Sequence, residues 1–242
     1  MRHQFLSVFG ICALLTAALS LPVSAADMPV KALSAAAVPS WSWTGLYVGV
    51  DAGYTWNRIG IFDPATPASG TATANADSAA LGAHLGYLYQ FDNPIVLGIE
   101  EDASWLNGNA IGPFPGTPIV GIATASRWDA SVRGVLGVTI DRALLYGTGG
   151  WSWLDGSMCG NGPLPATPSC FPGSNGPNLV GGWIAGGGLA YAITDRLSAR
   201  IEYLHADYGH FTYAGVWTGG SVNVTDTTDT VRAGLSYKFG LR

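Results

Sequence analysis

Apolar residues alternate with small or charged residues in eight stretches of this chain. In residues 231–239 the apolar positions are Val231, Ala233, Leu235, Tyr237 and Phe239, and the positions between them are Arg232, Gly234, Ser236 and Lys238. A repeat of two residues is typical of a β-strand with one apolar and one polar face. The same repeat predicts strands at residues 44–56, 79–91, 95–106, 127–140, 143–155, 180–192 and 197–208. The faces of 143–155 stay unassigned because that stretch is rich in glycine.

The predicted strands are joined by short turns and long loops in alternation. Turn signals such as Asp92-Asn93-Pro94 and Asp141-Arg142 mark the short connections. The long connections are residues 57–78, 107–126, 156–179 and 209–226. This asymmetry predicts an all-β fold, an eight-stranded antiparallel transmembrane up-and-down β-barrel with short periplasmic turns and long extracellular loops.

Aromatic residues gather at both ends of the predicted strands. The long-loop ends carry Trp56, Trp105, Trp128, Trp151, Trp153 and Trp183. The short-turn ends carry Trp43, Tyr87, Tyr89, Phe91, Tyr191, Tyr237 and Phe239. Strand alternation does not require two such bands, whereas aromatic rings favour the two interfaces of a membrane.

A soluble barrel of the lipocalin type would place the apolar face inside and the charges in water. The balance of charges on the polar face opposes this alternative, because enclosed charges have to be paired. We therefore expect a charge network in the lumen, formed by Asp51, Glu100, Asp102, Asp129 and Glu202 with Arg127, Arg133, Arg200, Arg232 and Lys238. Glu101 falls on the apolar face, where a bulge, a pairing neighbour or a protein contact would each account for it.

The first 26 residues read as a signal peptide, with Arg2 at the start, an apolar run, and a small-residue cleavage site before Asp27. Residues 27–42 are expected to form a short periplasmic tether, and residues 43–242 the barrel. No later segment holds 18 uninterrupted apolar residues, which argues against a helical membrane protein. Without Arg2 the chain keeps ten basic and sixteen acidic residues and has no basic cluster, so nucleic acid is not an expected partner.

Cys159 and Cys170 flank a loop rich in proline and glycine and predict a disulfide in an oxidising compartment. Cys12 lies inside the leader and should leave with it. Metal binding by the two remaining cysteines lacks the usual ligand spacing, and no metal or cofactor is expected.

Several segments resemble the small eight-stranded outer-membrane β-barrels of Gram-negative bacteria often labelled outer-membrane immunogenic or porin-family proteins. The matching segments are Trp43-Thr44-Gly45-Leu46-Tyr47-Val48-Gly49, Gly98-Ile99-Glu100, Leu145-Tyr146-Gly147-Thr148-Gly149-Gly150, Arg200-Ile201-Glu202-Tyr203 and residues 231–239. The resemblance implies insertion into the cell outer membrane by the barrel-assembly machinery. Gly240-Leu241-Arg242 departs from the aromatic C-terminus of such proteins, and Ala190 stands where a charge is common.

A structural or surface-interaction role is the expected function, because an eight-stranded barrel has room only for its own side chains. The alternative is a narrow porin passing small solutes or ions. An enzyme is not expected, since no Gly-x-Ser-x-Gly or His-Glu-x-x-His motif occurs. His84 is expected to be a lumen histidine. The expected partners are outer-membrane lipid and lipopolysaccharide, with an extracellular ligand at the long loops as a further possibility, and the barrel should be a monomer.

Overall fold

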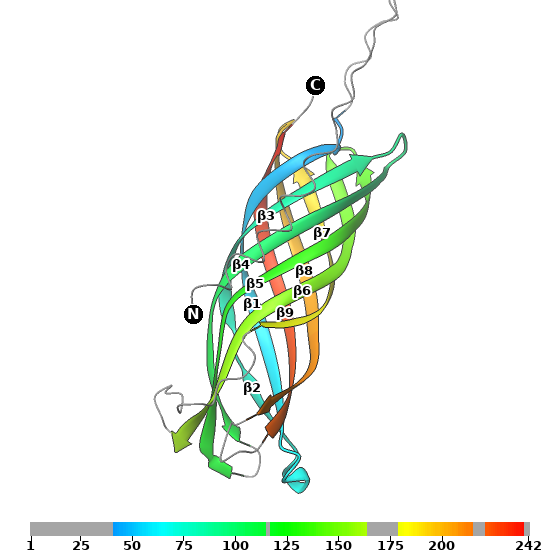
Figure 1. The fold of residues 1–242 in the computed structure, drawn as a ribbon. Helices are drawn as coiled ribbons and strands as arrows, with labels where there is room; N and C mark the ends of the chain where they lie inside the picture. Colours follow the sequence, from blue (N-terminus) through cyan, green and yellow to red (C-terminus); the bar gives the residue numbers. More distant parts are fainter. Residues whose placement is uncertain (1–40, 115–116, 164–178, 215–220, 240–242) are drawn as a thin grey trace, which may run out of the picture. The chain divides into compact units, whose positions relative to one another are not determined.

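The computed structural model describes residues 41–239 apart from 115–116, 164–178 and 215–220 (Figure 1). Its elements in chain order are β1 (Gly45–Phe62), the 3₁₀ turn η2 (Pro67–Ser69), β2 (Thr71–Asn75), β3 (Ser78–Gln90), β4 (Ile95–Phe114), β5 (Thr117–Ile140), β6 (Ala143–Pro163), β7 (Leu179–Ala192), β8 (Leu197–Ala214) and β9 (Ser221–Phe239). None of the helical segments in the described residues is long and apolar enough to cross a membrane.

The strands close into a barrel. Each strand from β3 to β8 pairs antiparallel with the next along the chain, and β1 pairs with both β3 and β9. The short strand β2 forms a hairpin with the far end of β1, from Arg58 to Phe62, and the other edge of this part of β1 still pairs with β9. Eight strands therefore form the wall, and the predicted fold class is confirmed.

The strands are longer at the extracellular end than the sequence pattern suggested. Residues 57–62 belong to β1 and residues 221–226 to β9, although both stretches were expected to be loop. The polarity of the two faces inverts there, because Ile59, Ile61, Val222 and Val224 point inward and are buried together. The expected loops at 107–126, 156–179 and 209–226 likewise contain strand over much of their described length.

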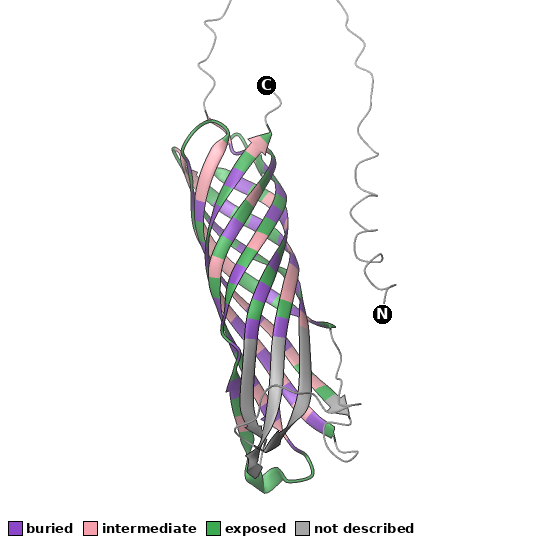
Figure 2. Cartoon of the chain, turned by 90° about the vertical axis from the view of Figure 1, so that its left-hand side faces the viewer, coloured by how far each residue is buried: buried purple, intermediate pink, exposed green. Residues whose placement is uncertain are grey.

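Exposed and buried residues alternate along the strands of the wall (Figure 2), and the exposed face is the apolar one. Val50, Leu81, Ile99, Leu136 and Leu145 are each more than half exposed, which suits a surface that contacts lipid rather than water. The faces of residues 143–155 are now assigned: Leu144, Tyr146 and Leu154 are buried in the lumen, whereas Leu145, Trp151 and Trp153 are exposed. The aromatic band at the extracellular end is also exposed at Trp56, Trp105 and Trp183.

Trp43 does not belong to the aromatic band at the short-turn ends of the strands, where the sequence pattern had placed it. Its side chain is only 5% exposed and packs in the periplasmic end of the lumen with Tyr47, Leu88 and Leu144. The residue precedes β1, so the alternation of the strand does not determine where its ring points. Trp43 is therefore a lumen residue and takes no part in the outer aromatic band.

The lumen is layered along its length. An apolar cluster that includes Val96 and Val135 lines the periplasmic end, and a second that includes Leu154 and Leu204 lies toward the extracellular end. Buried charged residues of the central strand segments lie between these two clusters. The interior is thus packed on both sides of a charged layer.

Candidate functional site in the barrel lumen

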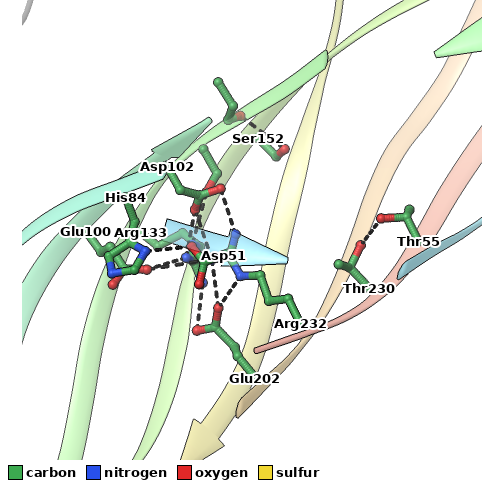
Figure 3. Close-up of polar contacts among 12 residues, drawn as sticks. Asp51, Thr55, His84, Glu100, Asp102, Arg133, Ser152, Glu202, Thr230 and Arg232 are labelled. Carbon is green, nitrogen blue, oxygen red and sulfur yellow. Dashed lines mark hydrogen bonds and ion pairs between the residues drawn. The ribbon is translucent and has the colours of Figure 1, made fainter. Parts of the chain in front are cut away.

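Six strands direct charged or ionisable side chains into the middle of the lumen. The charge network consists of Asp51 on β1, His84 on β3, Glu100 and Asp102 on β4, Arg133 on β5, Arg200 and Glu202 on β8, and Arg232 on β9. Figure 3 labels all of these residues except Arg200. Strand register brings some of the partners together directly, since Glu100 is opposite Arg133 and Glu202 is opposite Arg232.

Arg133 connects three carboxylates. Its Nη2 lies 2.6 Å from Glu100 Oε1 and 2.7 Å from Asp102 Oδ1, and its Nη1 lies 3.2 Å from Glu202 Oε1. Its Nε donates to Ser131 Oγ at 3.0 Å. The side chain has no exposed surface, so every one of these contacts is made away from bulk solvent.

Arg200 holds a carboxylate on each side. Its Nε and Nη2 donate to Asp51 Oδ1 and Oδ2, both at 3.0 Å, and its Nη1 donates to Glu100 Oε2 at 2.5 Å. The paired contacts to Asp51 are the bidentate arrangement in which guanidinium and carboxylate match best. Arg200 therefore ties the β1 side of the network to the β4 side.

Arg232 completes the set of guanidinium groups. Its Nε donates to Glu202 Oε2 at 2.8 Å, and its Nη1 lies 3.2 Å from Asp102 Oδ2. Four carboxylates are thus shared among three guanidinium groups and His84, and each arginine contacts at least two acids. Removing one partner of a buried ion pair typically costs about 3–5 kcal/mol, because the remaining charge loses its compensation.

Neutral side chains extend the network. Tyr47 donates to Glu100 Oε2 at 2.6 Å, and Tyr146 donates to Glu202 Oε1 at 3.1 Å. His84 Nδ1 lies 2.6 Å from Asp51 Oδ2, and its Nε2 lies 2.8 Å from Ser236 Oγ. Neither tyrosine was predicted from the sequence as a member of the network. Inward parity in the strand pattern could have identified Tyr47, whereas Tyr146 lies in glycine-rich β6, where the pattern assigns no faces.

Glycine provides the room for these side chains. A Cβ atom at Gly234 would collide with Asp51 Oδ1, and one at Gly49 would collide with His84 Nε2. The bulky members of the network therefore lie against strand positions that carry no side chain.

Three of the ten predicted network residues have other surroundings. Arg127 is exposed rather than inside, because the register of β5 shifts between Ser126 and Trp128. Asp129 lines a small cavity next to the network, but it forms no ion pair with a described residue, and its buried Oδ1 has no hydrogen-bond partner among them. Lys238 lies at the periplasmic mouth and donates to the carbonyl oxygen of Ser42.

The remaining sequence predictions concern Glu101, the two cysteines and a metal site. Glu101 pairs in register with Leu85 and Val132, so it lies on the outer face as its parity predicted. Cys170 and the side chain of Cys159 lie outside the described residues, and their disulfide remains a prediction. Within the described part of the chain, no three His, Cys, Asp or Glu side chains form a group that could hold a metal ion.

Comparison with known proteins agrees with this architecture. The 31 kDa outer-membrane immunogenic protein of Brucella melitensis is 33% identical over 95% of this chain and 98% of its own length. The 25 kDa outer-membrane immunogenic protein of Brucella abortus is 30% identical over 83% and 81%. The crystal structure of OprG from Pseudomonas aeruginosa has a similar fold, with a TM-score of 0.55 and 14% identity over 82% of this chain and 97% of that one.

A family model, described as the outer membrane protein beta-barrel domain, matches residues 13–239. The matched region contains all eight wall strands and every member of the charge network. The chain therefore belongs to the outer membrane protein beta-barrel domain family and is a protein of the cell outer membrane.

Proposed function

We propose that this protein is a structural and surface-interaction barrel whose lumen is closed by the charge network. The observation that carries the proposal is Arg133, which is fully buried and in contact with Glu100, Asp102 and Glu202. These contacts run from the β5 wall to β4 beside it and to β8 across the lumen. A solute passing along the axis would have to separate them.

The free space beside the network also supports a closed lumen. The cavity on its extracellular side has a volume of about 10 Å³, and the cavity on its periplasmic side about 40 Å³. The first is about the size that holds one water molecule. Neither is large enough for a hydrated solute such as a sugar.

A narrow porin is the second candidate function, and the observation that favours it is that cavities lie on both sides of the same charged layer. Conduction would then require only local rearrangement of the arginine side chains. The closed barrel and the narrow porin differ in whether solute crosses the membrane.

The order Asp51–His84–Ser236 resembles the acid, base and nucleophile of a hydrolase. Two features support a structural role instead. Asp51 is also held by Arg200, and Ser236 lies within β9 between β1 and β8, where the ladders on both sides use the backbone N–H groups. A hydrolase needs free donors to stabilise the oxyanion, and the strand ladder leaves none beside Ser236.

The extracellular ends of the strands are the natural place for surface interactions. Together with the hairpin of β1 and β2, they carry polar and small residues outward beyond the aromatic band. We propose that the barrel is a monomer in contact with lipopolysaccharide and that any further ligand binds at this end.

Solute uptake by proteoliposomes tests the proposal. Vesicles containing the refolded protein should swell in arabinose no faster than protein-free vesicles, whereas vesicles with an open porin swell rapidly. Swelling that increases in proportion to the amount of protein would support the narrow porin instead.

A further inference from the structure

The periplasmic end of the lumen contains a cavity that the charge network does not explain. This periplasmic pocket has a volume of about 40 Å³. Its wall is apolar at Leu88, Val135, Leu144 and Ala190, and positively charged at Arg196, Arg200 and Lys238. Aromatic side chains, including Trp41 and Trp43, cover the remainder.

Residues before β1 fold over the mouth of this pocket. Trp41 and Trp43 pack edge to face with ring centroids 5.7 Å apart. The backbone N–H of Trp43 donates to Gln90 Oε1 at 2.9 Å, and the backbone N–H of Gln90 donates to Thr44 Oγ1 at 2.9 Å. The two tryptophans are therefore fixed to the end of β3 and held in place over the opening.

Two buried hydrogen-bond donors in the wall of the pocket have no acceptor among the described residues. The indole Nε1 atoms of Trp41 and Trp43 are both buried, and neither has a hydrogen-bond partner among the described residues. Buried N–H groups are normally satisfied, so two such groups in one cavity wall indicate a missing acceptor.

The positive charges in the pocket are also only partly compensated. The Lys238 ammonium lies 3.8 Å from the centroid of the Trp41 ring and forms no ion pair with a described residue. Arg196 is exposed to solvent, donates to the Tyr237 hydroxyl at 3.3 Å, and forms no ion pair within the described part of the chain. Glu100 is the acid in the wall, but both of its oxygens are already in contact with network residues.

We propose that the periplasmic pocket binds a small aliphatic monocarboxylate that enters from the periplasm. The carboxylate would accept hydrogen bonds from the indole N–H groups and would face Lys238. The ligand would thus supply both the hydrogen-bond acceptor and the negative charge that the pocket lacks. The short hydrocarbon part would lie against Leu88, Val135 and Leu144. A volume of about 40 Å³ corresponds to roughly three water-sized sites, which limits the ligand to a few carbon atoms.

Binding of a monocarboxylate is a further activity beyond the proposed closed barrel. The two are compatible, because the ligand needs to enter only from the periplasmic side. Butyrate binding to the refolded full chain, followed by calorimetry and by the change in tryptophan fluorescence, tests it directly. Butyramide is the matched neutral probe, since it has the same carbon chain and no charge. We expect saturable butyrate binding and affinity for butyramide at least about tenfold lower, because the charge-assisted contacts are lost.

Three variants locate the site. Lys238→Met should lower butyrate affinity by about tenfold, and Trp43→Phe, which keeps the aromatic ring but removes the N–H donor, should lower it several-fold. Arg58→Met, at the extracellular end, removes one positive charge without touching the pocket and should leave affinity unchanged. The shift in gel mobility on boiling shows whether each variant is folded.

Several results would overturn the proposal. These are the absence of saturable butyrate binding to the wild type, equal binding of butyramide, and unchanged affinity in the folded Lys238→Met variant. Displacement of butyrate by chloride at equal concentration would show a simple ion site rather than a monocarboxylate site. The comparison of butyrate with butyramide uses the wild type alone, so it does not depend on whether a variant folds. The swelling assay tests the closed barrel separately, so either proposal can fail without the other.

Discussion

Arg200 on β8 and Glu100 on β4 belong to opposite walls of the eight-stranded barrel, yet Arg200 Nη1 lies 2.5 Å from Glu100 Oε2. Four strand steps separate β4 from β8 in either direction around the wall. The contact therefore crosses the full width of the lumen. Arg133 and Glu202 make a second crossing between β5 and β8.

Loss of Arg133 should destabilise the barrel more than loss of any exposed arginine. Arg133→Met removes one of the two guanidinium groups that contact Glu100, Asp102 and Glu202, the other being that of Arg232. The excess negative charge that this leaves in the lumen should lower the free energy of unfolding by about 3–5 kcal/mol. Arg58→Met is the control and should change it by less than about 0.5 kcal/mol. Urea unfolding of the barrel in lipid vesicles measures both. Equal stability of the two variants would show that the network contributes little to folding.

The extracellular extension should become less stable as pH rises. Burial raises the pKa of Asp226 to about 7, and this residue lies beyond the aromatic band, opposite Ile59. The folded pKa exceeds the unfolded value, so the unfolded form holds fewer protons between about pH 4 and 7, and stability falls across that window. Each unit of difference between the two pKa values corresponds to about 1.4 kcal/mol.

Hydrogen exchange in residues 57–62 and 221–226, corrected for its intrinsic pH dependence, should therefore show less protection at pH 8 than at pH 5. Asp226→Asn should flatten this dependence, because the amide cannot ionise. Asp195→Asn, in an exposed turn, is the control and should keep it. Persistence of the full pH effect in the Asp226→Asn protein would assign it to another group.

Trp43 should be shielded from lipid, unlike the tryptophans of the outer band. Brominated lipids quench tryptophans that contact the bilayer, and Trp105 is 61% exposed on the outer wall. Trp105→Phe should therefore reduce the quenchable part of the fluorescence, whereas Trp43→Phe should leave it unchanged. The opposite pattern would place Trp43 in the interface.

Cys159 and Cys170 are expected to form a disulfide in the extracellular connection between β6 and β7. Reduction should increase protease cleavage of that connection while the barrel stays folded, because the strand ladder does not depend on it. Mass spectrometry of the unreduced protein from cells measures the bond. Two free thiols would refute the pairing.

The wall of the barrel could be predicted from sequence, because the alternation of apolar and polar residues directly identifies the face of each strand that contacts lipid. The extracellular extension could not, since Ile59, Ile61, Val222 and Val224 turn their apolar side chains inward there and reverse the pattern. Glycine-rich β6 gave no parity signal, and its faces are set by its neighbours β5 and β7.

The balance of charges on the inward face identified most members of the charge network, but it also included residues that lie outside the network. Arg127 was misplaced because a bulge in β5 shifts its parity, and no sequence signal marks that bulge. Lys238 has inward parity, but it lies too close to the periplasmic end to reach the acids at the centre. The exact pairing depends on contacts across the lumen, such as Arg200 with Glu100, which strand register alone does not determine.

Single-channel recording in planar bilayers tests closure of the lumen most directly. The wild-type protein should give no stable conductance steps if the contacts of Arg133, Arg200 and Arg232 across the lumen close it as proposed. Reproducible channels of uniform size, with an ion selectivity that changes in Arg133→Ala or Arg232→Ala, would show that these charges line an open pore and would contradict a closed barrel.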